Sequence, residues 1–179
     1  MVKQLSSRDL DGLPKHFVLL VNTGASNKIH SYYLLDDLQK YAIVLALSHP
    51  AHNIHNILGK IGVRREKVHY IDTISKRIQA GLALEGCHYM HESDLNSVMK
   101  AVAAVNDKLP MKENILFVDS LHHLFMQNDK DTILRFIDFM HRRLKLLRLN
   151  SIFVVDLSRL DNEVREKLER ISDKILNIA

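Results

Sequence analysis

Short apolar runs alternate with amphipathic stretches along most of this chain. Six runs have the length of buried strands, and most end at polar or turn-forming residues: 16–21, 43–47, 68–72, 115–119, 152–156 and 174–178. In other stretches apolar residues recur every three or four positions, as on one face of a helix: 27–40, 50–59, 93–105, 129–149 and 158–168. Strands that alternate with helices predict a mainly parallel sheet with helices on both faces. We therefore expect one three-layer α/β domain over residues 1–179.

The ends of the predicted helices carry local signals. We expect Ser93 to cap the helix 93–105, and Ser158 to cap the helix after the fifth strand. In the helix 129–149 acidic residues lie in the first turn and basic residues near the end, as the helix dipole favours. The segment 73–91 has little periodicity and predicts only a short helix, Ile74 to Leu84.

The run 115–118 is the clearest strand in the sequence. Four apolar residues are followed directly by Asp119 and Ser120. This pattern predicts a buried parallel strand that presents Asp119 at its carboxyl end. Open α/β sheets bind ligands at that edge, so Asp119 is a candidate site residue. An aspartate that ends a strand also often caps the turn that follows, which is the structural alternative.

Composition narrows the class of protein. The net charge of +4 is modest and the basic residues are spread over most of the chain. No aromatic residues interleave the bases at the end of the helix 129–149, so nucleic-acid binding is not favoured. Cys87 is the only cysteine, which excludes a disulfide within the chain and fits a reducing compartment. No apolar run approaches the ~18 residues of a membrane span, and the first residues have no apolar signal core. We expect a cytoplasmic protein that does not bind membranes.

Residues 10–24, LDGLPKHFVLLVNTG, resemble the beginning of RecA-like ATPases of the KaiC and RadA type. In that family a similar turn leads into a strand, a glycine-rich phosphate loop called Walker A, and a helix. The segment Val118-Asp119-Ser120 is similar to the Walker B segment, and 153–156 and 172–177 resemble the two strands that close the core. The resemblance implies a P-loop NTPase fold. It also implies the strand order 3-2-4-5-1-6 for the six runs, with the Gly24 loop and Asp119 close together across the fifth strand.

The phosphate loop departs from the family pattern at two positions. Phosphate loops need glycines for backbone N–H groups, a lysine for charge and a hydroxyl for magnesium. Lys28 matches the lysine, but Asn27 replaces the preceding glycine and Ile29 replaces the hydroxyl. The resemblance implies ATP or ADP as the ligand, with these candidate nucleotide-binding residues: Gly24, Ser26, Asn27, Lys28 and Asp119. Because Ile29 cannot coordinate a metal, support of the triphosphate by magnesium is in doubt.

The catalytic acid of the family is also missing. Active members carry it after the second strand, where this chain reads Ala46-Leu47-Ser48-His49-Pro50. We therefore expect hydrolysis to be very slow or absent, and interpret the chain as an ATPase relative with a regulatory or assembly role. Its expected partner is a protein, either another copy of itself or an active relative. The alternative is a weak ATPase that uses Lys28 and Asp119.

The 11 histidines offer a further alternative. Several recur three residues apart or follow predicted strand ends, and two follow Cys87 closely. Imidazole, thiolate and carboxylate groups that converge at one sheet edge suit zinc. The alternative function is then a histidine-based metal hydrolase, with these candidate ligands: His49, His52, His88, His91 and His122. Such spacings also arise by chance, in which case most of these imidazoles are exposed and bind no metal.

Overall fold

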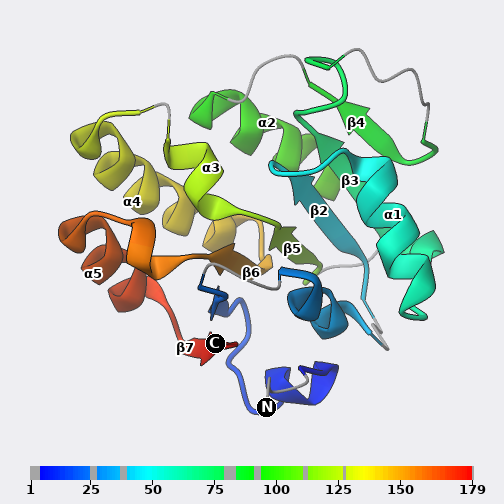
Figure 1. Ribbon diagram of the computed structural model, residues 1–179, viewed down its shortest axis with the longest axis horizontal. Coiled ribbons are helices and arrows are strands. Elements are labelled where there is room, and N and C mark those ends of the chain that lie inside the picture. The colour runs from blue at the N-terminus through cyan, green and yellow to red at the C-terminus, as the bar shows by residue number, and fades with distance from the viewer. Residues whose placement is uncertain are drawn as a thin grey trace.

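A computed structural model describes residues 5–24, 28–36, 40–78, 84–90, 94–110, 113–126 and 128–178. Its centre is a seven-stranded sheet in the order β4-β3-β2-β5-β6-β1-β7, in which every neighbouring pair is parallel (Figure 1). The strands are β1 (Val18–Asn22), β2 (Ala42–Ala46), β3 (Val68–Asp72), β4 (Cys87–Tyr89), β5 (Ile115–Val118), β6 (Asn150–Val155) and β7 (Lys174–Asn177). The order predicted for the six runs is therefore confirmed, and β4 adds one strand outside β3.

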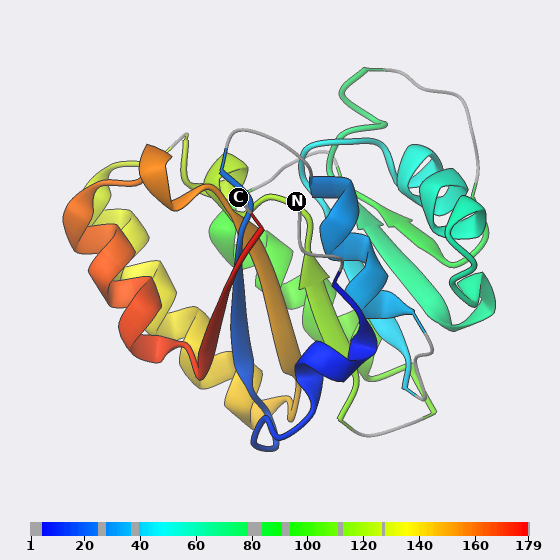
Figure 2. The ribbon, with the colours of Figure 1, turned by 60° about the horizontal axis from the view of Figure 1, so that its bottom comes forward.

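Helices cover both faces of the sheet (Figure 2). One face carries the α-helices α2 (Leu95–Asn106), α3 (Leu121–Phe125), α4 (Lys130–Leu146) and α5 (Asn162–Ile171). The other carries α1 (Ala51–Lys60) and the 3-10 helix η2 (Lys28–Leu35). Shorter 3-10 turns are η1 (Ser7–Leu10), η3 (Arg65–Lys67) and η4 (Leu157–Arg159). The predicted three-layer α/β architecture is confirmed.

The strands build two apolar layers because their side chains alternate between the faces. In β1, Val18 and Leu20 pack with α2, α4 and α5, whereas Leu19 and Val21 pack with η2 and α1. A strand buried on both faces reads as a continuous apolar run, which is why the central strands were visible in the sequence. Among the described residues, no helix is long and apolar enough to cross a membrane.

Two of the predicted helix caps need comment. Ser93 lies outside the described residues, and the residue that caps α2 is Asp94, whose carboxylate accepts the N–H groups of Asn96 and Ser97. Ser158 does not cap α5, because it lies in η4. Asp161 takes that role by accepting the N–H of Glu163. Aspartate caps a helix as serine does, through a side-chain oxygen, and the two caps stand one and three residues later than predicted.

Other differences concern short elements. The described part of the predicted helix Ile74 to Leu84 forms turns instead, up to Ile78. The helix expected over 27–40 is the 3-10 helix η2. Strand β4 and helix α3 were not predicted, since β4 has only three residues and α3 five, too few for a periodic signal.

Candidate functional site

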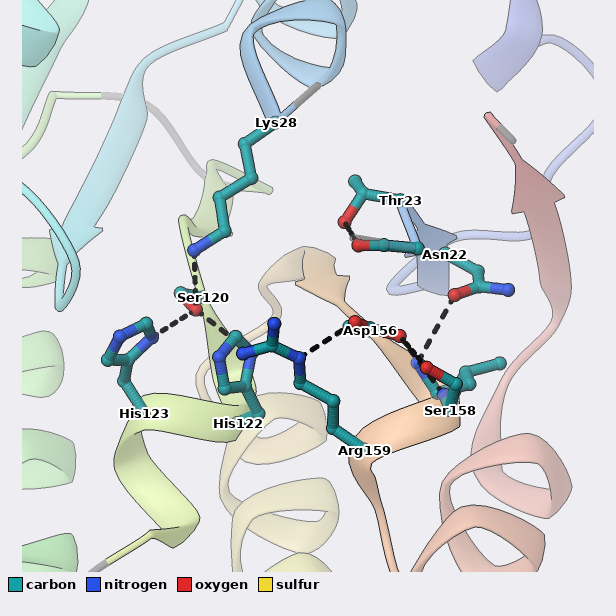
Figure 3. A network of polar contacts seen from close by, with 11 residues as sticks. Asn22, Thr23, Lys28, Ser120, His122, His123, Asp156, Ser158 and Arg159 are labelled. Atoms are coloured by element: carbon teal, nitrogen blue, oxygen red, sulfur yellow. Dashed lines mark hydrogen bonds and ion pairs between the residues drawn. The ribbon is translucent and has the colours of Figure 1, made fainter. Parts of the chain in front are cut away.

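The candidate site lies at the carboxyl edge of β1, β5 and β6, which are neighbours in the sheet although they are far apart in sequence. Lys28 begins η2 after β1, Ser120 follows β5, and Arg159 ends η4 after β6. Figure 3 shows these side chains converging on one small volume. A parallel sheet gathers its strand ends at one edge, so this convergence follows from the strand order.

The hydroxyl of Ser120 is the centre of the site. The ammonium of Lys28 donates to it at 2.9 Å, and the Nδ1 atoms of His122 and His123 lie 3.1 and 2.5 Å away (Figure 3). We call these four residues the Ser120 cluster. A serine hydroxyl has one hydrogen to donate and two lone pairs. Because Lys28 occupies one lone pair, one imidazole accepts the hydroxyl hydrogen and the other donates its Nδ1–H, so the two rings hold opposite tautomers.

The cluster is rich in basic groups that disfavour one another's charged forms. Burial lowers the pKa of Lys28, an effect that Asp119 opposes and Arg159 adds to. Burial also lowers the pKa of His122 to about 4, with further contributions from His123, Lys28 and Arg159. The pKa of His123 is lowered by burial and by Lys28. Both imidazoles are therefore neutral near pH 7. The positive charges of Lys28 and Arg159 make the edge attractive to an anion.

Asp119 is buried and fully engaged by the end of β2. Its carboxylate accepts the backbone N–H groups of Leu47 at 2.8 Å and Ser48 at 3.1 Å, and the hydroxyl of Ser48 at 2.7 Å. Burial raises its pKa, while the hydrogen bonds from Ser48 and Leu47 and the charge of Lys28 lower it. The carboxylate thus joins β5 to the loop after β2, and both its oxygens are occupied by chain donors.

Asp72, at the end of β3, is held in the same way. It accepts the backbone N–H groups of Ala51, Ile74 and Ser75, at 2.7 to 2.8 Å, and the hydroxyl of Ser75 at 2.6 Å. These bonds fix the start of α1 against the turn after β3.

Asp156 ends β6 and is the third such aspartate. It accepts the N–H and hydroxyl of Ser158, at 3.1 and 2.6 Å, and forms an ion pair with Nε of Arg159 at 3.1 Å (Figure 3). Asn22 supports the same turn by accepting the N–H of Leu157. The ion pair holds the Arg159 guanidinium beside His122 in the close-up view.

The predicted nucleotide-binding residues are only partly described. Lys28 lies in the Ser120 cluster, and Asp119 lies close enough to influence the pKa of Lys28. Gly24 has a φ of 56°, a left-handed conformation that favours glycine at the start of the loop. Ser26 and Asn27 fall outside the described residues. Ile29, which the sequence comparison expected in place of the magnesium hydroxyl, is 51% exposed.

The candidate zinc ligands do not gather at one place. His88 lies on the edge strand β4, separated from β5 by β3 and β2. His49 is exposed beside Ser48, His52 lies on α1, and His122 belongs to the Ser120 cluster. His91 is outside the described residues. Within the described ranges, no three histidine, cysteine or acidic residues are grouped so that they could hold a metal ion.

Ser120, His123 and Arg159 were not among the site residues predicted from the sequence, although Ser120 belongs to the Walker B-like segment. Arg159 gave no signal of its own, because only the sheet order brings the turn after β6 beside Ser120. The short contact of His123 with Ser120 depends on the first turn of α3. Hydroxyl and imidazole groups directly after a buried strand were the available clue.

Comparison with solved structures identifies the fold. KaiC-like protein PH0186 from the hyperthermophilic archaeon Pyrococcus horikoshii OT3 superposes with a TM-score of 0.69 at 14% identity, over 99% of this chain and 82% of that one. PH0250 from the same organism gives 0.66 at 12% identity, over 98% and 88%. A third structure, an ATPase domain, gives 0.62 at 13% identity, over 98% and 76%. No protein-family model matches the chain, and no curated protein sequence matches it significantly. The chain therefore has a RecA-like fold of the KaiC type.

Proposed function

We propose that this protein is a RecA/KaiC-like module that does not hydrolyse nucleotides and acts by binding a protein partner. We further propose that it has kept a weak site for the phosphate groups of ATP or ADP at Lys28. The similar structures include an ATPase domain and a KaiC-like protein, which supports an ATPase ancestry. In this reading the fold and part of the phosphate site remain, and the chemical step has been lost.

One observation carries the loss of hydrolysis. The aspartates that end β3, β5 and β6 each accept three or more hydrogen bonds or ion pairs from nearby chain groups. A carboxylate whose oxygens accept this many chain donors has few lone pairs left for a water molecule and little freedom to approach a metal. The loop after β2 supplies Ser48 and His49 but no acid. The carboxylates at the described edge thus have structural roles, which supports the proposed loss of an acidic base for hydrolysis.

The Ser120 cluster supports the proposed phosphate site. Lys28 is half-buried and its ammonium already points to the strand edge, so little side-chain entropy remains to be lost on binding. Arg159 adds a second cation nearby, as its effect on the pKa of Lys28 indicates. Charge-assisted hydrogen bonds from such cations are the usual means of holding phosphate without a metal.

A groove between α2 and α4 supports the proposed protein contact. Two adjoining hollows, of about 330 and 270 Å³, share Asn96 and Phe139. Phe139 is 41% exposed, and the basic residues that line the two hollows are Lys100, Arg135 and Arg143. An exposed aromatic side chain among cations suits an amphipathic segment with acidic residues. Either a second copy of the chain or an active relative could supply that segment.

A calorimetric titration with ATP, with and without magnesium, combined with a phosphate-release assay, tests the proposal. We expect weak binding, a small effect of magnesium, and no release above the buffer control. Release that depends on protein concentration and is lost in Asp119→Asn would overturn the non-catalytic assignment. Absence of ATP and ADP binding would remove the phosphate site and leave the protein contact as the remaining function.

A further inference from the structure

A cavity of about 360 Å³ lies beside the Ser120 cluster, on the face of the sheet that carries α3, α4 and α5. It shares His122 with the cluster and Arg159 with the turn after β6, but Lys28 does not line it. Its volume is within the range of small-molecule sites. The lining residues are His122, Phe125, Met126, Lys130, Ile133, Arg159, Leu160, Asp161 and Val164.

The inner part of the cavity is apolar and well ordered by packing. Phe125, Ile133 and Val164 are buried and come from three different helices. Met126 is 74% exposed at the outer side, which is unusual for a large apolar side chain. Flexible methionine side chains adapt to ligands of varied shape. The wall thus combines a fixed apolar floor with an adaptable apolar edge.

The charged groups of the lining favour an anion. Arg159 uses only its Nε in the ion pair with Asp156, and an arginine has five N–H donors, so its outer guanidinium edge remains able to bind. The side chain of Arg159 is largely exposed, so a ligand can reach it. Lys130 also lines the cavity and pairs with Glu163 at 2.8 Å. Asp161, the lone acid of the lining, has its carboxylate turned to the N–H of Glu163 as the cap of α5.

From this arrangement we propose that the cavity binds a small organic anion, with an aromatic or branched apolar body and a carboxylate, sulfonate or phosphate head. The body occupies the floor of Phe125, Ile133 and Val164, and the head meets the guanidinium of Arg159. This proposal does not rest on ATP binding, because Lys28 does not line the cavity. It gives the module a second ligand, which would contact side chains of α3 and α5 directly.

The test uses two probes of almost the same shape. 8-Anilinonaphthalene-1-sulfonate carries an anionic head, and N-phenyl-1-naphthylamine has the same rings without charge. We expect saturable fluorescence with the sulfonate at one site per chain, and affinity for the neutral probe weaker by about tenfold or more. Arg159→Gln should reduce sulfonate affinity to about that of the neutral probe, whose own affinity should change by less than about twofold.

A filled cavity provides an independent variant. Leu160→Trp places a bulky indole ring at the half-buried edge of the cavity and should weaken the affinity for both probes by about tenfold. Val164→Phe fills the cavity from its apolar floor and is a second variant of this kind. Thermal melting shows whether each variant is folded. Phe139→Ala, in the groove between α2 and α4, is the matched control and should leave both affinities unchanged.

Lys28→Ala separates this proposal from the proposed function. It should weaken ATP binding by more than about tenfold and leave sulfonate binding unchanged, whereas Arg159→Gln should reduce sulfonate affinity to about that of the neutral probe. Equal affinity for the charged and neutral probes would overturn the anion preference. Binding that does not saturate, or that survives both filling variants in folded protein, would overturn the cavity as the site.

Discussion

The ammonium of Lys28 lies 2.9 Å from the hydroxyl of Ser120, a residue 92 positions further along the chain. This hydrogen bond joins the loop after β1 to the end of β5 across the intervening strand β6. A phosphate that binds at this edge therefore meets a lysine whose position is already fixed by the sheet. The same bond means that the lysine must exchange a serine partner for the phosphate, which limits affinity.

The first prediction concerns Lys28 itself. Lys28→Ala should weaken ATP and ADP binding by more than about tenfold, because it removes the charged donor nearest to Ser120. Calorimetric titration measures the change. Lys60→Ala, at the exposed end of α1, is the matched control and should bind as the unchanged protein does. Equal affinities for both variants would place the nucleotide elsewhere.

The second prediction concerns Asp119 as a structural group. Asp119→Asn should lower the free energy of unfolding by about 2–4 kcal/mol. The amide nitrogen of asparagine would then face buried donors that are hydrogen-bonded to a carboxylate oxygen in the unchanged protein. Urea denaturation measures the loss. Asp94→Asn makes the same chemical change at the cap of α2, where asparagine caps equally well, and should cost less than about 0.5 kcal/mol. Similar small losses at both positions would contradict the structural role of Asp119.

The third prediction concerns magnesium. Magnesium should change ATP affinity by less than about threefold, because Ile29 offers no oxygen to the ion. Ile29→Thr restores a hydroxyl at this exposed position and should increase the magnesium effect beyond that range. Ile29→Val, which has nearly the shape of threonine without its oxygen, is the control. A strong magnesium effect in the unchanged protein would show that other residues hold the ion.

The fourth prediction concerns pH. The pKa of His122 is lowered from 6.5 to about 4 in the folded protein, so between these values the unfolded chain binds more protons than the folded one. Stability contributed by neutral His122 is therefore complete above pH 6.5 and is lost as the pH falls toward 4. Urea denaturation at several pH values should show this decline.

His122→Asn should make that decline shallower without removing it, because His123 and His141 also have lowered pKa values. An identical pH profile for His122→Asn and the unchanged protein would contradict the assignment to His122.

The sequence alone was sufficient to predict the strands that are buried on both faces. The run before Asp119 was recognisable because β5 lies at the centre of the sheet, where every side chain must be apolar. β4 was not, because its three residues lie at the edge and pair only with β3. The strand order itself came from the resemblance to RecA-like ATPases, since no local pattern determines which strands become neighbours.

The candidate site was predictable in part for the same reason. Lys28 and Asp119 were named from their places in the family pattern, and their closeness is visible in the pKa of Lys28. The engagement of Asp119 by Leu47 and Ser48 was not predictable, because it depends on the path of the loop after β2. Arg159 depends on an ion pair formed within the turn after β6.

Acid would change the hydrogen bonds that the hydroxyl of Ser120 can form. Protonation of the imidazole that accepts the hydroxyl hydrogen would give Ser120 three donors for its two lone pairs. One neighbour must then leave. Both rings are carried by short side chains on the first turn of α3, whereas Lys28 reaches the site on a four-carbon stem with more rotatable bonds. Acid strong enough to protonate that imidazole, near pH 4 for His122, would therefore release the ammonium of Lys28 from its serine, and an incoming phosphate would meet a lysine that no longer has to give up a partner.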